Sequence, residues 1–486
     1  MKNTLIIILF LLTSNNIFSS IIVTENVKNA LKKVYELKFN EANELINNED
    51  FENKYSIFIS NYIDFLKVIL NEKEIDYKRY KKNFIENIDI LENENNDSPE
   101  YFSTITEMYF QMSVSNFKMG ETYKGALNFY KTYRLLLQGI VKYPKNENLL
   151  KIFAFFKILF GSVPDEYIWI TDLIGIKGDI NSGLDFINYK YFKYCNETSE
   201  KSIEYSILKI IANDIFSEEY SNNISLKTNN LENPLFRISY IIYVIHHGKS
   251  NIALEITQKF KQDSDEYKID YFDYLQGIVL LYKLDSNANI YLENFAESFK
   301  GRNFLKSAYQ KLSWYYLIFN NLKKYDEYLN LIKKSGFNQF DADKQAINEI
   351  THYNTENISL LKARLLFDGG YYKKSDSILE SELNNTKLKN YHDEILYRLA
   401  RNSQESDNKN VAVKFYNQLI NDYNSETNYY CAVAFMNLGL IYEKSANYKL
   451  SKENYLLCLK SKNKQYRNSI QHKAKAGLNR IKDKKI

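Results

Sequence analysis

Pairs of small residues, each pair twelve residues apart, recur three times in the last third of this 486-residue chain. They are Ala363 with Ser375, Ala400 with Ala412, and Gly439 with Ser451. Successive pairs follow one another at intervals of 37 and 39 residues. Small residues are needed where two neighbouring helices cross closely, and a fixed period of this length is typical of repeat architectures. The spacing therefore predicts three successive helix pairs.

Helical periodicity extends through the rest of the chain. From about residue 26 onward, apolar residues recur at i, i+3, i+4 and i+7, with polar segments between them. Only 4 Pro and 15 Gly are present, so helix breakers are scarce. No Asn-Gly or Asp-Gly turn lies between alternating apolar runs, so strands have no support. We predict an all-α fold, an α-solenoid of about seven to nine stacked antiparallel helix pairs.

The repeats are divergent over residues 21–350 and regular over residues 351–465. In the divergent part, three groups of residues match the pattern of large and small side chains. They are Phe39 with Ala42; Phe117, Tyr123, Ala126 and Tyr130; and Ser313, Tyr316 and Leu329.

The N-terminus carries a basic start, an apolar run and a small-residue exit. Lys2 precedes the run Leu5–Leu12, and polar and small residues follow up to Ser20. This layout predicts a secretory signal peptide over residues 1–20, because the run is too short for a bilayer, which needs about 20 apolar residues. We expect export to the periplasm or the cell surface. An uncleaved anchor or a buried first helix is the alternative.

Residues 356–463 resemble tetratricopeptide repeat proteins. The unit from 432 to 463 fills the family pattern with Phe435, Leu438, Gly439, Tyr442, Tyr448, Ser451, Tyr455 and Cys458. The segments 360–372 and 473–480 make the chain similar to exported bacterial members of this class. The segment 163–186, with Pro164, Gly175, Gly178 and Gly183, resembles the tetratricopeptide repeat 39 family, whose members lack a secretory signal.

The resemblance implies a superhelical stack whose concave groove binds peptides or partner domains. It also implies that the second, fifth, ninth and twelfth positions of each first helix face this groove. The partner-binding residues expected on this basis are Arg364, Phe367, Tyr397, Arg401 and Leu440, with Glu394 and Val433 at second positions. Asn437 is added because it matches the clamp by which chaperone-binding repeats hold a C-terminal carboxylate. A lining of Arg and Tyr suits a carboxylate or an extended peptide. The alternative is that these are ordinary solvated side chains or local ion pairs.

The C-terminal segment 466–486 is predicted to be a basic capping helix and tail. Ala474, Leu478 and Ile481 form one apolar stripe in it, and terminal repeats need a polar outer face. Because the segment is rich in Lys and Arg, weak contact with an anionic membrane is the alternative.

The remaining features argue against chemistry. The net charge of +4 is too balanced to indicate a nucleic-acid partner. Three distant cysteines indicate packed thiols, and His246-His247 indicates a helix end rather than a metal site. We therefore predict no catalytic residue, no cofactor and no metal.

The function expected from the sequence is a non-enzymatic interaction scaffold of the bacterial cell envelope that binds a protein or peptide. An envelope hydrolase built on a helical frame, or a peripheral membrane component attached through the basic tail, are the alternatives. The sequence leaves the partner and the oligomeric state open.

Overall fold

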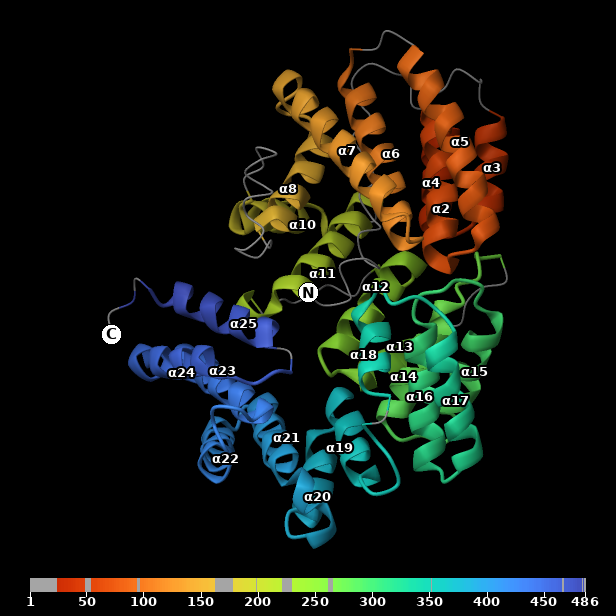
Figure 1. Ribbon diagram of the computed structural model, residues 1–486. Coiled ribbons are helices and arrows are strands. Elements are labelled where there is room, and N and C mark those ends of the chain that lie inside the picture. The colour runs from red at the N-terminus through yellow and green to blue at the C-terminus, as the bar shows by residue number, and fades with distance from the viewer. Residues whose placement is uncertain are drawn as a thin grey trace. The chain divides into compact units, whose positions relative to one another are not determined.

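The computed structural model describes residues 24–48, 54–93, 97–161, 178–197, 199–220, 230–260, 265–350, 352–465, 467–482 and 484. These residues form 23 α-helices and one 3-10 helix and contain no strand, which confirms the predicted all-α solenoid class (Figure 1). The chain divides into two compact units. The first comprises residues 1–279, 287–313 and 326–350, and the second comprises residues 280–286, 314–325 and 351–486.

The first unit holds the helices that precede the regular repeats. They are α2 (Glu25–Tyr35), α3 (Phe39–Asn47), α4 (Lys54–Asn71), α5 (Glu74–Asn93), α6 (Pro99–Lys118), α7 (Thr122–Lys142), α8 (Glu147–Gly161), α10 (Ile180–Tyr194), α11 (Glu200–Tyr220), α12 (Pro234–His246), α13 (Ser250–Lys259), α15 (Ala288–Ser298) and α18 (Asp341–Asn348). Three further helices contribute residues to both units: α14 (Tyr271–Tyr282), α16 (Leu305–Ile318) and α17 (Leu322–Lys334).

The second unit contains the three predicted helix pairs in sequence order. They are α19 (Ile358–Asp368) with α20 (Tyr372–Glu382), α21 (His392–Glu405) with α22 (Lys409–Asp422), and α23 (Tyr429–Lys444) with α24 (Tyr448–Lys460). A 3-10 helix, η3 (Thr386–Tyr391), joins the first two pairs, and α25 (Arg467–Arg480) follows the last.

The small residues lie at the helix crossings, as their spacing predicts. The Ser375 hydroxyl donates to the carbonyl oxygen of Ala363, and the Ser451 hydroxyl donates to that of Gly439, at 2.8 Å in each case. Ala400 and Ala412, the pair without a hydroxyl, are both fully buried. The same close approach therefore recurs in all three repeats.

The turn within each helix pair is also repeated. A residue with left-handed backbone geometry stands seven positions after the first small residue: Gly370 at φ 81°, Asp407 at 58° and Ala446 at 56°. This conformation ends one helix and reverses the chain into the next. Gly120, between α6 and α7, and Asn320, between α16 and α17, have the same geometry, which extends the turn to the divergent repeats.

One of the upstream assignments is wrong by one residue. In the α6–α7 pair the Ser113 hydroxyl donates to the carbonyl oxygen of Gly125 at 2.8 Å, so Gly125 is the small residue of the crossing. The neighbouring Ala126 is exposed. Tyr123 and Tyr130, which match large residues of the repeat pattern, are 77% and 47% exposed. Phe39 and Ala42 are buried between α2, α3 and their neighbours, as expected.

The C-terminal helix covers the last repeat. Ile470, Ala474 and Ile481 are buried in a cluster that includes Tyr455 and Cys458 of α24. The predicted apolar stripe therefore packs as a cap. All three cysteines of the chain are free and buried, also as expected.

Two expectations concern parts of the chain outside the described residues. The predicted signal peptide, residues 1–20, lies there, as does most of the tetratricopeptide repeat 39 signature, residues 163–177. None of the described helices is long and apolar enough to span a bilayer.

Candidate partner-binding surface

The ninth positions of the three first helices hold Arg364, Arg401 and Leu440, each directly after the small residue of its crossing. The side chains of Arg364 and Arg401 are 14% and 27% exposed, and Leu440 is half-buried. The repeat thus places one partly accessible side chain at the same point of α19, α21 and α23.

The structure brings together two of the expected residues, Phe367 and Arg401. The Cζ atom of Arg401 lies 5.5 Å from the centroid of the Phe367 ring, within the range of a cation–π contact. The Arg401 guanidinium also donates to Glu405 at 2.9 Å, and the Phe367 ring lies 5.5 Å from that of Tyr372. These contacts orient an Arg and a Phe that are both partly accessible.

Tyr397 lies between two core clusters. Its ring centroid is 5.1 Å from that of Tyr430, and its half-buried side chain packs against the clusters of both the second and the third repeat. A rigid aromatic side chain of this kind offers contact area at a low cost in conformational entropy.

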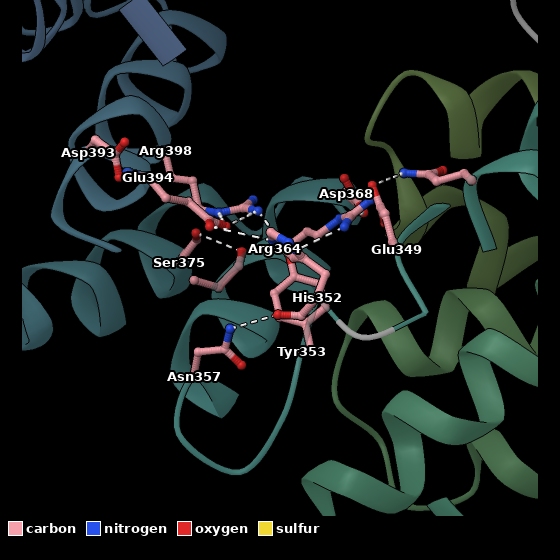
Figure 2. A network of polar contacts seen from close by, with 12 residues as sticks. Glu349, His352, Tyr353, Asn357, Arg364, Asp368, Ser375, Asp393, Glu394 and Arg398 are labelled. Carbon is pink, nitrogen blue, oxygen red and sulfur yellow. Dashed lines mark hydrogen bonds and ion pairs between the residues drawn. The ribbon is translucent and has the colours of Figure 1, made fainter. Parts of the chain in front are cut away.

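Arg364 makes several contacts within its own unit (Figure 2). Its Nη1 donates to the Tyr353 hydroxyl at 3.2 Å, and its Cζ lies 5.0 Å from the centroid of the Trp314 ring. Arg364 therefore holds the repeat together through its guanidinium, and little of that group is accessible.

Asn437 is also internal. It is 1% exposed, and its Nδ2 donates to the Tyr416 hydroxyl at 2.9 Å. The second positions, Glu394 and Val433, are 2% and 6% exposed, so the expectation that these positions face a groove is wrong. The side chains at these positions pack against neighbouring elements of the second unit.

Glu394 is the centre of a buried polar network that the sequence analysis missed (Figure 2). Its Oε1 accepts from Nε and Nη2 of Arg398 at 2.8 and 2.6 Å, and its Oε2 lies 3.5 Å from Nε2 of His352. Arg398 Nη2 also donates to the Tyr353 hydroxyl at 2.9 Å. The network joins the segment before α19 to α21.

The electrostatics keep Glu394 ionised. Burial opposes the charge on Glu394, yet the attraction of Arg398 and the hydrogen bond and charge of His352 hold the pKa of Glu394 well below its usual range. Burial raises the pKa of the Tyr353 hydroxyl, which stays protonated. Removal of either partner would therefore leave an uncompensated charge in the repeat interface.

Among the described residues, no group of three or more His, Cys, Asp or Glu side chains could hold a metal ion. His246 ends α12, as expected, and its Nδ1 lies 3.0 Å from the buried Asp214. Nδ1 of His247 lies 3.8 Å from the same carboxylate. His246 and His247 therefore both lie close to the Asp214 carboxylate.

The first unit contains a small interior cavity. It has a volume of about 40 Å³ and a mostly apolar lining, which also includes the buried ion pair of Glu72 and Lys118, 3.2 Å apart. A space of this size holds about one water molecule. A wider cleft of about 690 Å³ is open to solvent and is lined by Phe39, Lys67 and Tyr267 among others.

No family model matches the chain, and no curated protein matches it. The chain is similar to a chain of the crystal structure of an "APC/C hetero-tetramer Cut9-Hcn1", with 13% sequence identity over 95% of this chain and 93% of that chain and a TM-score of 0.31. The structural class of the protein is defined by contacts within the chain itself. Helices are paired in consecutive repeats, and small residues lie at the crossings, which fits a tetratricopeptide protein.

Proposed function

We propose that this chain is a non-enzymatic protein-interaction scaffold of the bacterial cell envelope. It binds a partner peptide or domain on the first helices of its C-terminal repeats, centred on Phe367, Arg401 and Leu440. The observation that carries the proposal is the register of the repeats. It sets the partly accessible side chains of Arg401 and Leu440 at equivalent points of α21 and α23, and Phe367 of α19 lies against Arg401.

The chemistry of these residues favours a partner with a carboxylate next to an apolar side chain. Arg401 supplies a planar cation that can form two parallel hydrogen bonds with a carboxylate. Phe367 in the repeat before Arg401 and Leu440 in the repeat after it supply apolar contacts. Aromatic and Arg side chains carry much of the binding energy in protein interfaces.

Affinity capture from envelope extracts, followed by titration of the purified partner, tests the proposal. Arg401→Glu and Leu440→Glu should each weaken binding at least tenfold while leaving the helical circular dichroism unchanged. Lys414→Glu, at an exposed position of α22, is the matched control and should bind like the parent chain. Equal binding by all variants, or hydrolysis of an envelope polymer without a bound partner, would contradict the proposal.

Export is a separate part of the proposal, because it depends on residues 1–20. Leu9→Arg would place a charge inside the apolar run of the signal peptide. We expect this variant to stay in the cytoplasm at full length, whereas the parent chain is recovered from the envelope fraction without residues 1–20. Recovery of both chains in the same compartment at the same mass would contradict export by this segment.

A further inference from the structure

Helix α7 of the first unit exposes a continuous row of large side chains along one edge. The apolar members are Tyr123 at 77%, Leu127 at 51%, Tyr130 at 47%, Leu137 at 36% and Val141 at 81% exposure. Arg134, also exposed, completes the row. Successive members are alternately four and three residues apart, and we call this row the α7 seam.

The opposite face of α7 already packs in the interior. Gly125, Tyr133, Leu136 and Gly139 are buried there, so the seam is not needed for the core of the first unit. A spacing of alternating four and three residues is the a/d pattern of a helix that pairs with one other helix. A helix that lies on a membrane has a wider apolar face. The narrow seam therefore favours a helical partner.

The charges of α7 indicate which helix is the partner. The helix contains four basic residues and no acidic residue. Three of the four are neutralised within the chain: Lys124 by Glu121 at 2.7 Å, Lys131 by Glu92 at 3.0 Å and Lys142 by Asp97 at 2.7 Å. An acidic partner is thus not required, and a second copy of α7 would meet little net repulsion.

Arg134 is the fourth basic residue. Within the described part of the chain its guanidinium bonds only to the Tyr130 hydroxyl, at 3.3 Å. A tyrosine ring presented by another helix would give this exposed cation a second, favourable neighbour through a cation–π contact.

The seam is complementary to itself when two copies run antiparallel about residue 132. In that arrangement Tyr123 faces Val141 of the second copy, and Leu127 faces Leu137. Tyr130 faces Arg134 of the second copy, so the Tyr130 ring of one copy is the second neighbour of the Arg134 guanidinium of the other. The small Ala126 faces Gln138 beside the seam, so the two backbones can approach. We propose that the α7 seam is the interface of a homodimer, in which each helix occupies the other's seam and the two-fold axis crosses the seam at the level of residue 132.

Sedimentation velocity of the full chain at micromolar concentration tests this interface. The parent chain should sediment as a dimer. Leu127→Glu combined with Leu137→Glu should sediment as a monomer with unchanged helical content, because four carboxylates would then meet in the seam. Ile75→Glu, at a position of α5 that is 74% exposed, is the control and should remain dimeric.

Cysteine pairing distinguishes the direction of the two helices. The three native cysteines are buried, so single introduced thiols report on the seam. A chain with Leu127→Cys mixed with a chain with Leu137→Cys should form a mixed disulfide under a mild oxidant. Leu127→Cys alone should not, because the two equivalent positions would lie about 15 Å apart along antiparallel helices.

Three results would overturn the homodimer. They are a monomeric parent chain, a dimer that survives the double Glu substitution, and a disulfide between two Leu127→Cys chains. Binding of the monomer to anionic vesicles through the same seam would also overturn it, in favour of a membrane contact. The C-terminal partner surface lies in the other unit, so its titration serves as an independent measurement.

Discussion

The ring of Tyr455 lies directly over the backbone of Gly477. A Cβ atom at Gly477 would be 2.3 Å from Cζ of Tyr455, and a Cβ atom at Gly439 would be 2.5 Å from the same ring. The ring is therefore held between α23 and the capping helix α25, and its hydroxyl donates to Glu443 at 2.6 Å. Two glycines make room for one aromatic side chain in the last repeat.

Gly477→Ala should lower the free energy of unfolding. The added methyl group would overlap a ring that is 1% exposed and fixed by its hydrogen bond, and overpacking of this kind costs about 1 to 3 kcal/mol. In a free helix the same change would add stability. Denaturant unfolding measures the effect, and Lys475→Ala, exposed on the same helix, is expected to change stability by less than about 0.5 kcal/mol. A stabilised Gly477→Ala variant would contradict this packing.

Glu394→Gln should destabilise the C-terminal unit strongly. The substitution leaves the Arg398 guanidinium buried without its carboxylate, and breaking a buried ion pair costs about 3 to 5 kcal/mol. Glu405→Gln removes the partner of Arg401 at a site that is 38% exposed, and we expect a change below about 1 kcal/mol. Urea unfolding at pH 7 compares the two. Equal losses would show that burial of Glu394 is unimportant.

The same carboxylate should make the unit sensitive to acid. The pKa of Glu394 is lowered in the folded state, so its contribution is complete above the ordinary carboxyl pKa of 4.5 and is lost as the pH falls through the folded value. The midpoint of urea unfolding should therefore fall below about pH 4.5 in the parent chain. Glu394→Gln should lack this part of the decrease.

Asp343 should give the first unit the opposite dependence. Burial raises the pKa of Asp343 to about 7, although its oxygens accept from the backbone N–H groups of Phe304 and Ser307 at 2.8 and 3.1 Å. The folded chain then binds more protons than the unfolded chain between about pH 4 and 7, so stability falls as the pH rises across this interval.

Asp343→Asn tests that dependence by removing the titrating group. Unfolding measured at pH 5 and pH 8 should differ less in this variant than in the parent chain. Asp341→Asn, at a position of α18 that is 53% exposed, is the control and should retain the parent's dependence. An unaltered pH dependence in Asp343→Asn would assign the effect to another group.

The salt bridge of Arg480 separates a capping role from membrane attachment. Its Nε and Nη2 donate to the two oxygens of Glu443 at 2.7 and 2.9 Å. Arg480→Gln should lower the melting temperature by a few degrees, because it removes a bidentate contact of the cap worth about 1 to 3 kcal/mol. Lys482→Gln, an exposed residue of equal charge, should not. If both variants lost binding to anionic vesicles equally and neither changed the melting temperature, the result would favour the membrane alternative.

The helix pairs were predictable because their signals are local. The twelve-residue spacing of Ala363 with Ser375 and of Gly439 with Ser451 reports one backbone crossing, and each crossing is closed by residues of a single repeat. The α6–α7 assignment failed because Gly125 and Ala126 are both small. Choosing the wrong one rotates the expected interior face of α7 by about 100°. That rotation makes Tyr123 and Tyr130 appear to be repeat-pattern residues, although both are exposed.

The binding surface was less predictable because exposure depends on what covers a helix. Phe367 and Arg401 meet through positions that the repeat itself sets. Glu394 and Asn437 lie on first helices of the same repeats, but they are covered by neighbouring elements that the repeat pattern does not describe. The pair of Glu394 and Arg398, four residues apart, was the signal for the buried network, since such pairs are neighbours on a helix.

The most direct measurement is photo-crosslinking in living cells with a benzophenone amino acid in place of Leu440. If the first-helix face of the C-terminal repeats binds a protein, the residue at position 440 should form a discrete protein adduct, and the same probe at Lys414 on α22 should form none. No adduct at position 440, or the same adducts at both positions, would contradict a partner-binding surface on these repeats.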